Sequence, residues 1–128
     1  MNSSEKIKPL IWIGSTKRAV QDFPLEVRKV VGFALYQAQE GKKHIQAKPL
    51  KGFRGAGVLE IIEDYDGDTY RAVYTVKFSE VVYALHAFQK KSKKGIKTPK
   101  QDINLIKQRL IDAELDYQNF LKSKRRKQ

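Results

Sequence analysis

The sequence predicts an α+β domain, and three features of the 128-residue chain support this class. Apolar residues recur at helical spacing over residues 27–38. An Asp66-Gly67 pair separates two segments rich in β-branched and aromatic residues, which is typical of a tight β-hairpin. Residues 98–101 read Thr-Pro-Lys-Gln, a capping-box pattern that starts a helix. We therefore expect the order β-α-α-β-β-β-α, with the helices on one side of a small antiparallel sheet.

The first half of the chain is expected to hold one strand and a helical hairpin. Residues 9–14 form the strand and end in glycine. A short helix comes next, and a longer one begins at Pro24, whose missing amide hydrogen costs nothing in a first turn. The longer helix ends at Gly41, and the hairpin over 16–39 has one apolar stripe and a basic outer face. Residues 42–57 contain several Gly and Pro residues and are expected to form a loop.

The second half is expected to hold three strands and a final helix. Segments 58–63, 69–78 and 81–89 form an antiparallel meander, and the strand around Trp12 pairs at one of its edges. Residues 99–117 form the helix, again with an apolar stripe. One face of the sheet is expected to stay open to solvent.

Length and composition indicate one domain. The chain has a mass of 14.8 kDa and is 41% hydrophobic, which is enough to build a core and too apolar for a disordered chain. We expect residues 1–121 to form a single domain and residues 122–128 to form a basic tail.

The charge of the chain predicts a polyanionic partner, most simply a nucleic acid. Lys and Arg number 26 against 14 Asp and Glu, which gives a net charge of +12 and an isoelectric point near 9.9. From residue 90 onward there are 13 basic and 4 acidic residues, so most of the excess lies in the last third.

Several functional classes are not expected. The chain has no cysteine, which excludes disulfides, a thiol nucleophile and cysteine-ligated zinc. The two histidines, His44 and His86, lie in different elements without ligand spacing, so neither a metal nor another cofactor is expected. No apolar segment is long enough to span a membrane, and the N-terminus lacks the pattern of a secretion signal. We expect a cytoplasmic protein that binds no membrane.

Cations on the predicted strands suggest where a nucleic acid would bind. A hairpin that turns at residues 79–80 pairs Arg71 with Phe88 and brings Lys90 and Lys91 within about 10 Å of Arg71, at a rise of ~3.3 Å per residue. Such cations, together with the aromatic rings of Tyr70, Tyr74 and Phe88, suit a single RNA strand on an open sheet face. The alternative is that Arg71 forms a cross-strand pair with an acid.

Five segments of the chain together match the pattern of a known family. They are residues 48–52 (Lys-Pro-Leu-Lys-Gly), 59–60 (Leu-Glu), 70–74 (Tyr-Arg-Ala-Val-Tyr), 85–92 (Leu-His-Ala-Phe-Gln-Lys-Lys-Ser) and 97–99 (Lys-Thr-Pro). Over residues 8–117 the chain resembles the RelE/HigB-like toxins of bacterial toxin–antitoxin modules, and in particular the phage-derived HigB branch, the Tad type. The resemblance implies a RelE-like fold, growth arrest through ribosome-dependent mRNA cleavage, and inhibition by a cognate antitoxin, often a helix-turn-helix protein.

The resemblance also implies roles for single residues. Arg71 matches the strand arginine that stabilises the transition state. Lys90 and Lys91 match a basic pair that contacts phosphate or donates a proton, and Lys48 and Lys51 match lysines that contact RNA or act in acid–base roles. The chain departs from the pattern in two places: an isoleucine follows Glu60 where relatives commonly have arginine, and the C-terminal tyrosine that RelE uses as a base has no counterpart.

The chemistry of metal-free RNA cleavage suits these residue types. The 2′-hydroxyl of the RNA is the nucleophile, so the protein supplies a base, an acid and a cation for the phosphorane. Arginine serves as the cation because it is permanently charged and bidentate. A lysine can be the acid or base if neighbouring cations lower its pKa. His86 is another candidate, and the alternative interpretation is a packed strand histidine.

The expected site has three parts. The candidate catalytic residues are Arg71, Lys90, Lys91 and His86. The candidate RNA-binding residues are Lys48, Lys51, Arg54, Tyr74, Lys93 and Lys94. Phe33 and Tyr36 lie off the main helical stripe and are expected to be exposed antitoxin contacts; otherwise they widen the core face.

The predicted function is that of an mRNA interferase, a metal-independent endoribonuclease that inhibits translation and has the ribosome, mRNA and an antitoxin as partners. Two alternatives remain open at this point. ParE-type members of the same superfamily poison DNA gyrase and cleave no RNA. A nucleic-acid-binding protein without catalysis would also fit the charge.

Overall fold

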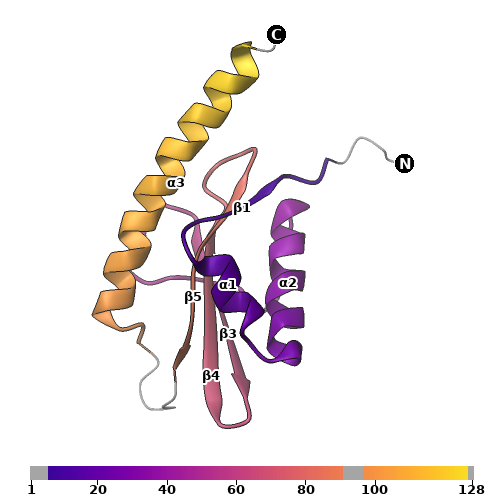
Figure 1. Cartoon of the computed structure of the whole chain (residues 1–128), viewed down its shortest axis with the longest axis vertical. Coiled ribbons are helices and arrows are strands. Elements are labelled where there is room, and N and C mark those ends of the chain that lie inside the picture. Colours follow the sequence, from indigo (N-terminus) through magenta and orange to yellow (C-terminus); the bar gives the residue numbers. More distant parts are fainter. Residues whose placement is uncertain (1–5, 91–96, 127–128) are drawn as a thin grey trace.

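The computed structural model describes residues 6–90 and 97–126, and its elements are strands and helices of one mixed domain (Figure 1). The strands are β1 (Leu10–Trp12), β2 (Lys48–Pro49), β3 (Val58–Tyr65), β4 (Asp68–Thr75) and β5 (Val82–Lys90). The helices are α1 (Thr16–Gln21), α2 (Leu25–Gln39) and α3 (Lys100–Arg126). The α+β class is confirmed. The predicted order lacked β2, a short strand inside the segment that was expected to be a loop.

The five strands form one sheet in the order β1-β5-β4-β3-β2. β1 pairs in parallel with β5 at one edge, and the other neighbouring strands are antiparallel. In the two-residue turn between β3 and β4, Asp66 has a φ of 50° and Gly67 a φ of 86°. Positive φ at both positions is what a type I′ hairpin turn requires, so the Asp-Gly prediction is confirmed.

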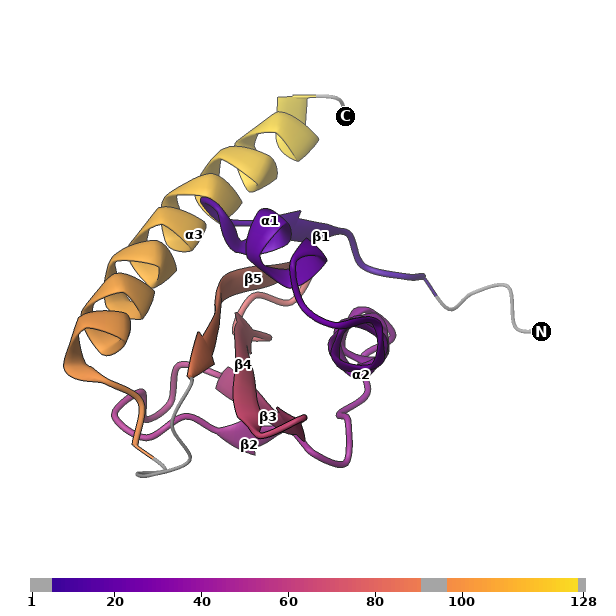
Figure 2. The same ribbon diagram turned by 60° about the horizontal axis from the view of Figure 1, so that its bottom comes forward.

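Helices cover both faces of the sheet, and the prediction of an open face is wrong. α1 and α2 pack on one face, whereas α3 crosses the other (Figure 2). Residues Ile106, Ala113 and Tyr117 of α3 are buried against the second face. The physical reason is that β4 and the first part of β5 are buried on both faces, and such strands need two layers of cover.

α3 is the longest helix, and it continues through the segment that was expected to be a basic tail. Lys124, Arg125 and Arg126 form its last turn. Its middle is held to the sheet by a 2.8 Å hydrogen bond from the Tyr83 hydroxyl to Asp116. Among the described residues, no helix is both long and apolar enough to cross a membrane.

A β-bulge in β5 decides which side chains face α3. Val73 pairs with His86, but Tyr74 pairs with Ala84, so Leu85 is an extra residue on β5. Leu85 packs in the cluster under α3, and His86 lies on the same face of the sheet because Val73, its partner, does. The bulge therefore turns His86, and with it Phe88 and Lys90, toward the face that α3 covers.

Candidate functional site

Three rows of side chains cross the sheet on the face that α3 covers, because directly paired residues point to the same face. The first row consists of Lys48, Glu60, Val73 and His86; the second of Ile62, Arg71 and Phe88; and the third of Asp64, Thr69 and Lys90. The predicted register of Arg71 opposite Phe88 is confirmed. Acidic, basic and aromatic side chains thus gather in one small area of the sheet.

Arg71 is at the centre of this area, and it is 2% exposed rather than on an open face. Its Nη1 lies 3.0 Å from Oε2 of Glu60 and 3.1 Å from Oγ1 of Thr98. The Thr98 hydroxyl in turn donates to Oε2 of Glu60 at 3.1 Å. The expectation of an exposed arginine is wrong because Thr98, in the segment that leads into α3, lies over Arg71 and bonds to it. The alternative interpretation, a cross-strand pair with an acid, describes the geometry.

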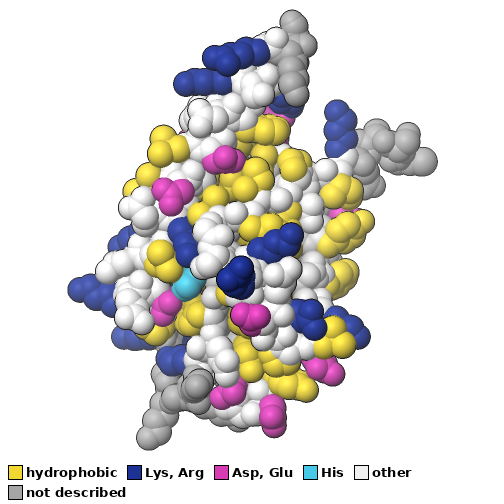
Figure 3. Space-filling model, viewed as in Figure 1, with side chains coloured by type: hydrophobic (Ala, Val, Ile, Leu, Met, Phe, Trp, Pro, Cys, Tyr) yellow, Lys and Arg dark blue, Asp and Glu magenta, His cyan; other side chains and the backbone are white. Residues whose placement is uncertain are grey.

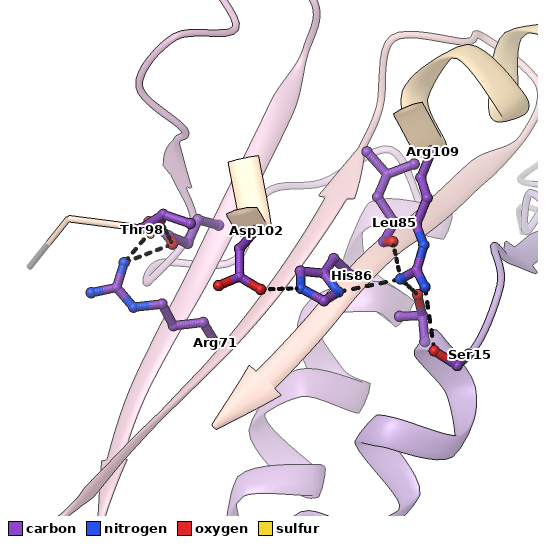
Figure 4. A network of polar contacts seen from close by, with 9 residues as sticks. Ser15, Arg71, Leu85, His86, Thr98, Asp102 and Arg109 are labelled. Atoms are coloured by element: carbon purple, nitrogen blue, oxygen red, sulfur yellow. Dashed lines mark hydrogen bonds and ion pairs between the residues drawn. The ribbon is translucent and has the colours of Figure 1, made fainter. Parts of the chain in front are cut away.

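His86 lies beside this group and uses both of its ring nitrogens (Figure 4). Nε2 is 2.7 Å from Oδ1 of Asp102, and Nδ1 is 3.2 Å from Nη1 of Arg109. Since a guanidinium can only donate, Nδ1 of His86 is the acceptor of this hydrogen bond. Nε2 therefore carries the ring proton and donates its hydrogen bond to Asp102. Burial lowers the pKa of His86 below its usual 6.5, the Arg109 charge lowers it further, and Asp102 opposes both effects. The ring is therefore held neutral in one tautomer.

Arg109 connects α3 to two other elements. It donates to the carbonyl of Leu85 at 3.0 Å, to the hydroxyl of Thr16 at 3.2 Å and to that of Ser15 at 3.3 Å. A Cβ at Gly14 would lie 2.9 Å from the guanidinium, so the glycine makes room for this approach. The result is a fixed position for the first half of α3 over Arg71 and His86.

Four residues of this network were not among the predicted site residues: Glu60, Thr98, Asp102 and Arg109. Thr98 lies two residues before α3, and Asp102 lies in the first turn of α3. The sequence shows that these two residues are close in the chain. It does not show which strand residues they contact, because the tertiary fold decides which face of the sheet α3 covers.

The lysines predicted as catalytic or RNA-binding residues, together with Arg54, fall into three groups. Lys48, Lys51 and Arg54 are exposed on β2 and the loop after it. Lys91, Lys93 and Lys94 lie outside the described residues. The ammonium of Lys90, a predicted catalytic residue, is 3.3 Å from the carbonyl of Lys97, close to where α3 begins.

Tyr74 cannot stack on an RNA base in this structure, and that prediction is wrong. It is 1% exposed and packs in the cluster under α2, on the face of β4 opposite to Arg71. Burial raises the pKa of Tyr74 to about 12. The aromatic ring directly opposite Arg71 is that of Phe88, which is half-buried and stacks on His86 with 5.0 Å between ring centroids.

Phe33 and Tyr36 are 55% and 46% exposed, so their predicted exposure is confirmed, and antitoxin binding at them stays a prediction. The residues that the structure describes contain no cluster of three His, Cys, Asp or Glu placed to hold a metal ion.

A protein-family comparison decides which family these features belong to. The model of the family described as "Phage derived protein Gp49-like (DUF891)" matches residues 18–111, about three quarters of the chain. The chain belongs to the Gp49-like family. Gp49-like proteins are a family of RelE/HigB-like toxins, which agrees with the resemblance found in the sequence. The matched range contains all of α2 and the network from Glu60 to Arg109. No curated protein and no solved structure matches the chain.

Proposed function

We propose that this Gp49-like chain is the toxin of a toxin–antitoxin module, of the phage-derived HigB branch and with a RelE-like fold, and that it cleaves mRNA on the ribosome without a metal. The observation that carries the proposal is the Glu60–Arg71 pair, at 3.0 Å, among the basic side chains of Lys48 and Lys90. A carboxylate and a guanidinium side by side are the base and the cation that this reaction needs.

In the proposed reaction, Glu60 accepts the proton of the 2′-hydroxyl. The 2′-oxygen attacks the adjacent phosphorus, and Arg71 stabilises the charge on the phosphorane oxygens. The bond to the 5′-oxygen then breaks, and this leaving group takes a proton from an acid. The products are a 2′,3′-cyclic phosphate and a free 5′-hydroxyl. Lys90 and Lys91 are the proposed acids, and Lys48, Lys51 and Arg54 are the proposed contacts to flanking phosphates.

Access to Arg71 sets a condition on this mechanism. Because Arg71 is 2% exposed and bonded to Thr98, a phosphate can reach it only after Thr98 has moved away. Side-chain bonds hold this end of α3: Thr98 to Glu60 and Arg71, and Asp102 to His86. The proposed active form on the ribosome is one in which these bonds have opened.

One observation favours a second candidate, a toxin that binds nucleic acid without cleaving it. Arg71 is buried in an ion pair, whereas Lys48, Lys51 and Arg54 are exposed on the other side of Glu60. If Arg71 only stabilises the fold, the chain has a basic surface that can bind a nucleic acid but has no cation that stabilises the transition state.

Brief induction of the chain in growing bacteria, followed by primer extension on abundant transcripts, separates the candidates. New 5′ ends within translated codons would support the endonuclease. Intact transcripts with inhibited translation would favour binding without cleavage, and intact transcripts with stalled replication would indicate a ParE-like action on gyrase. The control is the double variant Glu60→Leu/Arg71→Met, which lacks the proposed base and cation. It replaces the pair by apolar side chains of similar size, so the fold should be kept.

A further inference from the structure

The outer face of α2 carries large apolar side chains that the rest of the described chain does not cover. Leu25, Phe33 and Tyr36 are 51%, 55% and 46% exposed. The ring of Phe33 contacts that of His44 at 5.6 Å between centroids, and Ile45, which follows His44 in the chain, is 95% exposed. In Figure 3, hydrophobic side chains lie next to Lys and Arg along the edge of the molecule that α2 forms. Exposed apolar side chains gathered in this way are typical of a protein interface.

Gly32 lies in the middle of this face, roughly 10 Å along the helix axis from Leu25 at ~1.5 Å per residue. Glycine inside a helix is destabilising relative to alanine, so it needs a reason. A Cβ at Gly32 would meet no described atom of the chain within 4 Å, so packing within the protein is not that reason. The glycine leaves a shallow gap in the helix surface, with apolar side chains on either side, where a second backbone can approach closely.

The charge around this gap is mostly positive. Arg28 and Lys29 are exposed on the same face of α2. One acid of the helix is nearby, Glu26, and it interacts with the Tyr65 hydroxyl. Two cations against one acid favour a partner surface that is negative.

We propose that the face of α2 centred on Gly32 binds an acidic amphipathic helix of a partner protein, whose apolar side contacts Leu25, Phe33 and Tyr36. The proposal rests on the proposed function in one respect, namely that this partner is the antitoxin. α2 covers the face of the sheet opposite to Arg71 (Figure 2), so the partner helix binds away from the Glu60–Arg71 pair.

A nucleic acid is the other polyanion that cations and aromatic rings could bind. The aliphatic side chains argue against it here, because Leu25 and Ile45 have no ring on which a base can stack. A helix from a protein would bury both of them, and it would also use the gap at Gly32. The observations therefore favour a protein helix.

The test measures binding of the purified full-length chain to the antitoxin of the same module by biolayer interferometry. Gly32→Gln adds a side chain where the protein itself leaves room, so the thermal midpoint should stay the same or rise. We expect it to weaken antitoxin binding at least tenfold, and the double variant Arg28→Glu/Lys29→Glu to do the same. Asn104→Gln and Lys107→Glu, at exposed positions of α3, are matched controls and should leave the affinity within about twofold.

The outcomes separate this proposal from the proposed function. Tight binding that neither α2 variant weakens would overturn the inference and leave the toxin assignment intact. No binding by the unmodified chain would overturn both the inference and the antitoxin part of the proposed function. Unchanged antitoxin binding, with weaker binding of a single-stranded RNA oligonucleotide by the Arg28/Lys29 variant, would instead make α2 a nucleic-acid surface.

Discussion

Arg71 and Glu60 form an ion pair at 3.0 Å beneath the start of α3, and their side chains are only 2% and 10% exposed. The pair joins β4 to β3 and, through Thr98, joins both to the residues that precede α3. Burying two charges costs free energy that their mutual attraction and extra hydrogen bonds offset. A chain that keeps such a pair needs it either for folding or for chemistry, and the two roles predict different behaviour of single and double variants.

The first prediction concerns stability. Arg71→Ala leaves Glu60 buried without its cation, and we expect the free energy of unfolding to fall by about 3–5 kcal/mol. Urea denaturation followed by circular dichroism measures this. The double variant Glu60→Leu/Arg71→Met should be close to the unmodified protein. If Arg71→Ala were as stable as the unmodified chain, the pair would be solvated in solution and the buried geometry would be wrong.

The second prediction concerns pH. The pKa of His86 is lowered in the folded chain by burial and by Arg109, against an unfolded value near 6.5. The unfolded chain therefore binds the proton more readily, so the stabilisation is complete above about pH 6.5 and is lost as the pH falls through the folded pKa. Unfolding midpoints in urea from pH 8 to 5 should show this decline in the unmodified protein and a shallower one in His86→Gln. Equal slopes for both proteins would remove His86 as the cause.

The third prediction concerns RNA binding. Each lysine or arginine that contacts a phosphate contributes about one unit to the slope of log affinity against log salt. We expect Lys48→Ala, Lys51→Ala and Arg54→Ala each to reduce that slope for a single-stranded RNA oligonucleotide. Lys107→Ala, on the exposed side of α3, is the control and should not change it. If the salt dependence changed in Lys107→Ala and not in the other three variants, the RNA would bind on α3 instead.

The fourth prediction concerns the end of α3. A chain that stops at Leu121 keeps Tyr117 and Phe120, which pack against the second face of the sheet. It loses the exposed ion pair between Lys124 and Glu80, and such pairs contribute little to stability. We expect the thermal midpoint to fall by only a few degrees and mRNA cleavage to remain. Loss of all activity in a folded truncated chain would show that the last turn of α3 contacts RNA or the ribosome.

Local patterns in the sequence predicted most of the elements, because their causes are local. The Asp66-Gly67 turn needs two residues that tolerate positive φ, and the 27–38 stripe needs only helical spacing. The register predicted at Arg71 is observed, but it depends on the bulge at Leu85 as well as on the turn after β4. That turn sets Thr75 opposite Tyr83, and without the bulge Ala87 would face Arg71. The bulge at Leu85 was not predicted, because no residue type marks it.

The candidate site was predicted only in part. Arg71 and Tyr74 are three positions apart on one strand, and simple alternation places their side chains on opposite faces. The prediction that both lie on one RNA surface is therefore wrong. The burial of Arg71 is different. It depends on α3 packing across the second face of the sheet, and that choice rests on contacts between residues far apart in the chain.

The central claim is that the buried Glu60–Arg71 pair performs the cleavage, and one measurement tests it most directly. The unmodified chain and the double variant Glu60→Leu/Arg71→Met are compared, at equal concentration and with matched unfolding curves, for cleavage of an mRNA in a translating extract. We predict that the folded double variant cleaves the mRNA at least ~100-fold more slowly than the unmodified chain, because losing one preorganised charge stabiliser has an effect of this size. Cleavage at the same codons and at a similar rate by the double variant would contradict it.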